Sequence, residues 1–420
     1  MSSSRYLNSM TEFSEASTDA RGGTFRSLQY RNARIFFLGL GVSNSGSWLQ
    51  LTATSLLLYR LTGKAADIGY NVAFQYMPML VLGLWAGTIA DRVNRRKITL
   101  ITQGLMATQA LALGIFAVFD LINPIVIYSL SLILGMVNVF DNPARRGFVT
   151  ELVPNAYIGN AVSLQVAVMT ASRIVGATLA SLLIGPLGFG PLFFLNGLSY
   201  LAILGSLLAI RKSEMFTVVR KQQSRSALTE LYHFILRQPR LRTALVLYVV
   251  VAVCSMNFIV SLPKISDIRW GSDSYFGLLV AVIGAGSVVG SLMTARLDRV
   301  SHRWYALSML TLGISSLFLA WAPSVLIATL VCIPLGVGYA AIISSVNSLT
   351  QQDTPNNMRS RMFSVTGIIF FGSTPIGGPI TGLVADKVSP EWSIAYGGVA
   401  CLLSAGVMFL QIKPWRAESV

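Results

Sequence analysis

Charge is scarce in this sequence of 420 residues: only 12% of them are charged, whereas 53% are hydrophobic. A soluble domain usually carries about twice that share of charge. The hydrophobic residues also form long runs, and about 20 apolar residues are enough to cross the hydrocarbon core of a bilayer as a helix. The composition therefore excludes an ordinary soluble domain and predicts an all-α membrane protein that has lipid as a partner.

Cysteine and histidine are also rare. The three cysteines, Cys254, Cys332 and Cys401, lie inside apolar runs without metal-ligand spacing, so neither a disulfide nor a metal site is predicted. The sequence contains no phosphate-binding loop and no nucleophile elbow. We therefore expect no enzyme, no cofactor and no ATP-driven pump.

Twelve apolar segments have the length of a transmembrane helix. They divide the chain into a cytoplasmic tail (1–34), an N-terminal six-helix bundle (35–210), a cytoplasmic linker (211–242), a C-terminal six-helix bundle (243–412) and a second cytoplasmic tail (413–420). The expected spans are 35–58, 69–90, 98–119, 124–142, 158–184, 191–210, 243–262, 275–295, 305–321, 324–347, 363–384 and 393–412.

Basic residues outnumber acidic ones by 32 to 17, which in a soluble protein would suggest a nucleic-acid partner. Here 26 of the 32 fall in the segments placed on the cytoplasmic side, five fall in outer loops, and one, Arg173, lies within a span. This bias sets membrane topology. We therefore expect no nucleic-acid partner, and we place the chain in the inner membrane with both termini in the cytoplasm.

Two short motifs recur half a chain apart. Asp91-Arg92-Val93 after span 2 matches Asp298-Arg299-Val300 after span 8, at an offset of 207. A Pro-Asn pair before span 5 recurs before span 11, at an offset of 201. Two related halves are typical of secondary carriers that bind their substrate at the interface between the halves.

Residues 87–97 closely resemble the loop 2–3 signature of the major facilitator superfamily. Four other stretches, 31–36, 46–50, 140–145 and 172–176, look like the branch of drug and siderophore exporters that includes the enterobactin exporter and macrolide efflux pumps. The chain departs from these patterns at Asn94, where the signature usually has Gly, and at Ala177, where the exporters usually have Pro.

The resemblance implies twelve transmembrane helices in two pseudo-symmetric six-helix bundles. It also implies a monomeric secondary exporter of a drug or siderophore-like small molecule, which works by alternating access as a proton-driven antiporter and confers drug resistance. An importer or a lipid flippase of the same fold stays open as an alternative. A non-transporting receptor would need a sensory domain, for which the extramembrane segments are too short.

The resemblance further implies a conformational latch on the loop after span 2. Asp91 would bind cations or a helix N-terminus of the facing bundle while the protein is open to the outside. Topology alone also explains the basic neighbours of Asp91, because positive charge marks cytoplasmic loops. The residues assigned to gating are Gly87, Asp91, Arg92, Arg95, Arg96, Asp298, Arg299, Asp141 and Arg145.

Arg173 near the middle of span 5 needs a protein or water environment, because an arginine at this depth costs roughly 3 kcal/mol. It either binds an anionic part of the substrate or anchors a structural network. Polar residues at helical spacing on other spans either line a cavity or join helices by hydrogen bonds. The residues assigned to the cavity are Arg173, Gln50, Asn71, Gln75, Asn138, Gln165, Asn257 and Asn347.

Carboxylates are missing from the central part of every expected span, and Asp141 is placed at the inner end of span 4. This argues against a pump that holds a cationic drug on a buried acid. Proton coupling is therefore an expectation from the resemblance alone.

Overall fold

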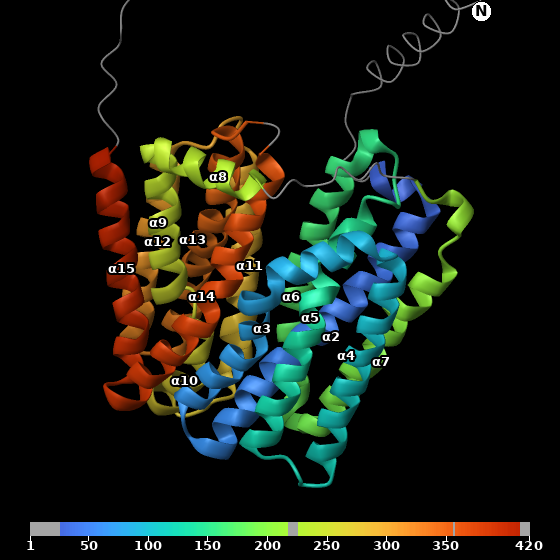
Figure 1. The fold of residues 1–420 in the computed structure, drawn as a ribbon. Coiled ribbons are helices and arrows are strands. Elements are labelled where there is room, and N and C mark those ends of the chain that lie inside the picture. Colours follow the sequence, from blue (N-terminus) through green and yellow to red (C-terminus); the bar gives the residue numbers. More distant parts are fainter. Residues whose placement is uncertain (1–25, 217–225, 356–357, 412–420) are drawn as a thin grey trace, which may run out of the picture.

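The computed structural model describes residues 26–216, 226–355 and 358–411, and nearly all of them lie in helices joined by short loops (Figure 1). Most of the two expected tails, and residues 217–225 of the expected linker, lie outside the described residues.

The first half of the chain forms six long helices. They are α2 (Arg31–Thr62), α3 (Ala65–Arg92), α4 (Arg95–Val118), α5 (Pro124–Val149), α6 (Ile158–Leu187) and α7 (Phe189–Ala209), with the short turns η1 (Arg26–Gln29), η2 (Asn155–Tyr157) and η3 (Lys212–Glu214).

The linker contributes α8 (Ser226–Arg237), and the second half follows. Its elements are α9 (Pro239–Cys254), η4 (Phe258–Val260), α10 (Leu262–Trp270), α11 (Tyr275–Ala295), α12 (His302–Ala320), α13 (Val325–Gln352), α14 (Arg359–Lys387) and α15 (Pro390–Gln411).

Ten helical segments of the described chain are long and apolar enough to cross a membrane. Helices α2 and α3, with 32 and 28 residues, are not among the ten; in α2, serine, threonine, asparagine and glutamine recur along the helix. Large apolar side chains such as Leu38 and Leu410 point away from the protein and are 73% and 86% exposed. Such surfaces fit contact with lipid.

The seventh expected span, 243–262, is not one continuous helix. Helix α9 ends at Cys254, and a short turn leads from there into α10. The Asn257 amide donates hydrogen bonds to the carbonyl oxygens of Ala252 and Val253, at 3.1 and 3.0 Å. These carbonyls lie in the last turn of α9, where carbonyl groups lack helical partners. Asn257 thus stabilises the break between α9 and α10. The sequence does not reveal this break, because the segment as a whole is apolar.

The helices form two sets, α2–α7 and α9–α15, with a boundary between them (Figure 1). Two pairs of helices make the main contacts across this boundary, α3 with α14 and α6 with α11. Helix α8 lies at one end of the molecule and α10 at the opposite end (Figure 1). The amphipathic α8 packs on α9 and α14, with Leu231 buried.

Helices α3 and α14 run antiparallel and approach each other very closely near the α10 end. A side chain at Gly69 would collide with the backbone of Gly378, and one at Gly382 would collide with the backbone of Ala65 and Ala66. Glycine at such positions lets two helix backbones touch. We call this contact the α3–α14 seam.

A larger side chain in the α3–α14 seam should lower the stability of the protein. Gly69→Leu should destabilise the protein by about 1–3 kcal/mol, because the backbone of α14 leaves no room for the new side chain. Thermal melting of the purified protein measures this loss. Gly367→Leu on α14 is the matched control, because nothing lies within 4 Å of its added carbon. Equal melting temperatures for the two variants would contradict a tight seam.

Candidate functional site

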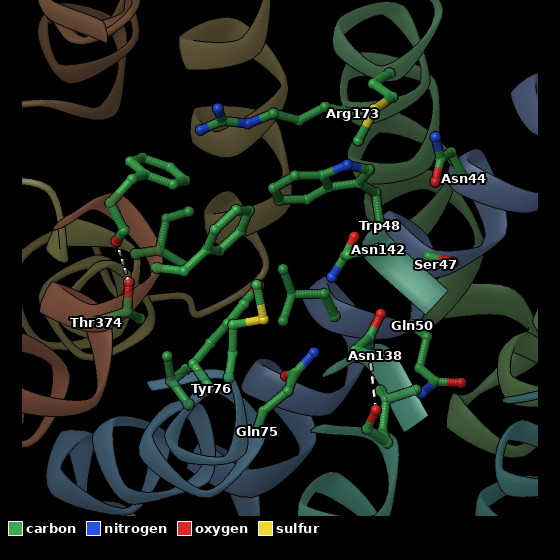
Figure 2. Close-up of a pocket in the computed structure, with 18 of the residues that line it drawn as sticks. Asn44, Ser47, Trp48, Gln50, Gln75, Tyr76, Asn138, Asn142, Arg173 and Thr374 are labelled. Atoms are coloured by element: carbon green, nitrogen blue, oxygen red, sulfur yellow. Dashed lines mark hydrogen bonds between the residues drawn. The ribbon is translucent and has the colours of Figure 1, made fainter. Parts of the chain in front are cut away.

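A cavity of about 350 Å³ lies between the two sets of helices. Its lining comes from α2 to α7 in the first half and from α13, α14 and the break after α9 in the second half. Figure 2 shows the polar wall, to which Ser47, Gln50 and Asn138 contribute, facing the side that carries Tyr76 and Thr374. Of the residues assigned to the cavity from sequence, the structure brings these to its lining: Gln50, Gln75, Asn138, Asn257 and Arg173.

Arg173 projects from the middle of α6 toward the cavity (Figure 2). Its side chain is 9% exposed, and its guanidinium carbon lies 5.0 Å from the ring centre of Trp48 and 4.9 Å from that of Tyr339. Its Nε is buried without a hydrogen-bond partner, and Arg173 makes no ion pair with any residue that the structure describes. Trp48 belongs to α2 and Tyr339 to α13, so this cluster joins the two halves.

Several cavity amides already have protein partners. The Gln50 amide donates to Gln109 at 3.1 Å, and its carbonyl oxygen accepts from Asn196 at 2.7 Å. Asn138 donates to the carbonyl of Leu134 in its own helix, at 3.0 Å. Both side chains line the cavity, and Gln50 also joins α2 to α4 and α7, so both interpretations of the polar residues at helical spacing apply to Gln50.

Three residues assigned to the cavity lie outside its lining. Asn347 on α13 accepts a hydrogen bond from Thr366 on α14 at 2.7 Å, so it joins two helices of the second half. Asn71 and Gln165 are 1% and 4% exposed, and they are buried within the helix packing. Helical spacing placed all three on polar faces, but it does not tell a helix contact from a cavity wall.

Asp141 is buried far more completely than its expected place at a helix end implies. It is 0% exposed, and it accepts hydrogen bonds from Thr102 and Gln103 of α4 at 2.8 and 2.9 Å. Its Oδ2 lies 2.9 Å from Nε of Arg145, and Arg145 also donates to Asn44 at 3.2 Å. Arg145 lines the cavity, so this buried ion pair forms part of its wall.

The residues assigned to the inner latch do not form one cluster among the described side chains. For Gly87, Asp91 and Arg92 the structure describes the helical backbone of α3 only, so this part of the predicted latch lies outside the described side chains. Arg95 donates to the carbonyl of Gly147 at 3.0 Å, and Arg96 to that of Leu208 at 3.3 Å, so both contacts stay within the first half.

For the other residues assigned to gating, the described contacts also do not join the two halves. Asp141 and Arg145 are both on α5, so their ion pair is internal to one helix. Asp298 and Arg299 are exposed on the loop between α11 and α12. The latch around Asp91 stays a prediction.

Polar contacts between the halves are present at the α10 end. The Tyr59 hydroxyl donates to Asp267 at 2.7 Å. Arg60 holds Asp273 through two hydrogen bonds, at 2.6 and 2.8 Å. The first partner of each pair belongs to α2 and the second to α10 or the loop after it. A forked arginine–carboxylate contact is among the stronger polar contacts in proteins.

Asp386, next to the last residue of α14, completes these contacts. Its carboxylate accepts hydrogen bonds from the backbone N–H groups of Ala65 and Ala66, at 3.0 and 2.8 Å, and thereby caps the N-terminus of α3. Lys264 lies 2.5 Å from the same carboxylate. We call the three carboxylates and their partners on α2 and α3 the distal closure.

A pair of aromatic rings packs across the α3–α14 seam, between the distal closure and the cavity. Tyr76 of α3 stacks on Phe371 of α14, with ring centres 6.0 Å apart and an interplanar angle of 21°. Both residues line the cavity. The distal closure, this ring pair and the glycine contacts of the seam therefore all join the two halves between the cavity and the α10 end.

Two sets of helices that share a polar cavity, with α3–α14 and α6–α11 as the crossing pairs, fit the arrangement expected of a transporter of the major facilitator superfamily. The chain belongs to the family described as transmembrane secretion effectors, whose model matches residues 23–420.

Two of the similar curated proteins carry efflux names. The chain is 25% identical to the multidrug efflux pump Tap of Mycolicibacterium fortuitum over 84% of this chain and 88% of the pump. It is 22% identical to macrolide efflux protein A of Streptococcus pyogenes over 92% of this chain and 98% of that protein. The resemblance to drug exporters is thereby confirmed.

A solved structure supports the fold. A bacterial homologue of the human lysosomal transporter Spinster, in an inward-facing and unoccupied conformation, superposes with a TM-score of 0.71. The match covers 90% of this chain and 97% of that one at 14% sequence identity. The expected all-α fold of the major facilitator superfamily is confirmed.

The distal closure predicts that Asp386→Asn shifts the protein toward a state open at the α10 end. The neutral amide loses attraction to the α3 N-terminus and to Lys264, a change of about 1–2 kcal/mol. Spin labels at exposed Leu121 and Ile268, in a background without native cysteines, should show longer distances by double electron–electron resonance.

Glu391→Gln is the matched control for that experiment. Glu391 contacts Arg269 at 3.3 Å near the same end of the molecule, but both residues belong to the second half. Its loss should leave the label distances unchanged. Identical distance distributions for Asp386→Asn and the unaltered protein would show that Asp386 does not hold the halves together.

Proposed function

We propose that the protein is a secondary active exporter that moves a small molecule, drug-like or siderophore-like, across the inner membrane by alternating access. The observation that carries this proposal is a polar cavity lined by both halves, with contacts between those halves at the α10 end. The efflux names of the relatives favour export over import.

The distribution of basic residues supports an orientation with both termini in the cytoplasm. In this orientation α8 lies on the cytoplasmic side and the distal closure on the outer side. The cavity then receives substrate from the cytoplasm or the inner leaflet. Rupture of the distal closure releases the substrate outside, while the loop around Asp91 closes the cytoplasmic end. We propose that one monomer in the lipid bilayer suffices for this cycle.

Vesicles of known orientation test the direction of transport. We expect a compound that accumulates in cells lacking the gene, as identified by mass spectrometry, and that falls again when the gene is restored. Inside-out vesicles carrying the protein should then take up this compound, and right-side-out vesicles should not. The opposite pattern would make the protein an importer. Movement of a labelled phospholipid between leaflets of proteoliposomes, without uptake of the compound, would make it a flippase.

Proton coupling needs a group that can bind and release a proton during the cycle. Among the described carboxylates, only that of Asp141 is fully buried, and Arg145 connects it to the cavity wall. Ionisable groups buried in membrane proteins commonly mark proton relays. We therefore propose Asp141 as the proton-binding group of an antiporter.

Asp141→Asn should abolish uptake driven by a pH gradient in inside-out vesicles, because an amide cannot exchange a proton at this position. Binding of the transported compound to the purified variant should persist. Asp120→Asn, at an exposed site beyond α4, should keep both activities. Gradient-driven uptake by Asp141→Asn at the normal rate would rule out Asp141 as the proton carrier.

A further inference from the structure

We propose that Arg173 recognises an anionic group of the substrate, and that the cavity selects amphiphilic aromatic anions over cations of the same size. This inference rests on the proposed transport function and specifies its substrate class. It concerns equilibrium binding to the cavity, so it does not depend on the direction of transport.

The charge inventory of the cavity is the first support. None of its lining residues is acidic, and only Arg145 and Arg173 are basic. Arg145 already has its counter-ion in Asp141, at 2.9 Å. While Asp141 is ionised, Arg173 is therefore the uncompensated charge of the lining. In a medium of low dielectric constant, such a charge attracts anions and repels cations much more strongly than in water.

The contacts of Arg173 are the second support. An arginine that serves only to join helices would direct its N–H groups to carbonyls or carboxylates. The described partners of Arg173 are instead the rings of Trp48 and Tyr339, which contact the cation without accepting its in-plane hydrogen bonds. Its donors are therefore available to a bound carboxylate or sulfonate, which a guanidinium can hold with two parallel hydrogen bonds.

The aromatic lining gives the rest of the substrate class. Trp48, Tyr76, Tyr339, Phe370 and Phe371 all face the cavity. Rings stack well on other flat ring systems. A substrate with a planar apolar body and one anionic group matches both this surface and Arg173.

The same cluster offers a link between binding and conformational change. Tyr339 is the ring partner of Arg173 that comes from the second half. An anion that takes up the donors of Arg173 lowers the attraction between its cation and the Tyr339 ring. Substrate binding therefore weakens one central contact between the halves, at the depth where they must separate during the cycle.

Two xanthene dyes of similar size and opposite charge test the proposal. We would measure fluorescence anisotropy of anionic fluorescein and cationic rhodamine 123 with the protein in lipid nanodiscs. The unaltered protein should bind fluorescein at least about 10-fold more tightly than rhodamine 123, which corresponds to about 1.4 kcal/mol. Arg173→Gln should lose about 10-fold in fluorescein affinity and little or nothing for rhodamine 123.

A second variant covers the case in which Arg173→Gln does not fold. Met169 lines the cavity one helical turn before Arg173. Met169→Glu places a carboxylate where it can pair with the guanidinium, so the cation stays but its charge is neutralised. This variant should bind the two dyes about equally, because the paired charges favour neither sign. Arg242→Gln, at an exposed arginine near the start of α9, is the matched control and should keep the preference for fluorescein.

A preference of the unaltered protein for rhodamine 123, no binding of fluorescein, or an equal loss of both dyes in the Arg173 and Met169 variants would overturn the proposal. The last result would assign Arg173 a purely structural role. Binding with the expected charge preference, but without uptake of any compound by vesicles, would instead leave this inference standing and remove the transport function.

Discussion

The close approach of α3 and α14 is the constraint on which the observed conformation depends. Only because Gly69 and Gly382 carry no side chains can the two backbones touch near the α10 end. This contact places the carboxylate of Asp386 within hydrogen-bond distance of the first N–H groups of α3. It also sets the spacing at which Tyr76 stacks on Phe371. The ring contact and the hydrogen bonds of Asp386 therefore both result from the close packing of α3 and α14.

The cost of burying charge in the membrane explains why the ionisable residues of the cavity differ in their partners. Asp141 and Arg145 form an ion pair, and hydrogen bonds from Thr102 and Gln103 to Asp141 and from Arg145 to Asn44 offset part of the cost of burying these two charges. Arg173 has only aromatic partners, and two cation–π contacts of about 0.5–2 kcal/mol each offset much of the roughly 3 kcal/mol cost of its position. Because the ring contacts offset much of the cost of its position and no ion pair with a described residue holds it, Arg173 can bind a ligand without first breaking a strong internal ion pair.

The fold could be predicted from the sequence because span length, apolar runs and the internal repeat are properties of the chain itself. Arg173 was found for the same reason, since it is the only basic residue within an expected span. The sequence does not show that Asp141 is fully buried, because its burial comes from Thr102 and Gln103, 39 and 38 residues away on another helix. The role of Asp386 depends on partners 320 and 321 residues away, which no local pattern reveals.

Because α3 and α14 pair antiparallel, the same kind of contact between a carboxylate and a helix N-terminus can close either end of the protein in the proposed cycle. Asp386 is the last residue but one of α14, and Asp91 holds the same position in α3. A carboxylate at the C-terminus of its own helix is disfavoured by that helix's dipole, and it gains when it faces the N-terminus of another helix. Asp386 makes this gain at Ala65 and Ala66 while the α10 end is closed. The predicted latch would bring Asp91 to the start of α14, which antiparallel packing places at the α8 end. If each acid is stabilised only when its own end closes, the two closed states lie close in free energy. A small driving force from substrate or proton binding is then enough to move the protein between them.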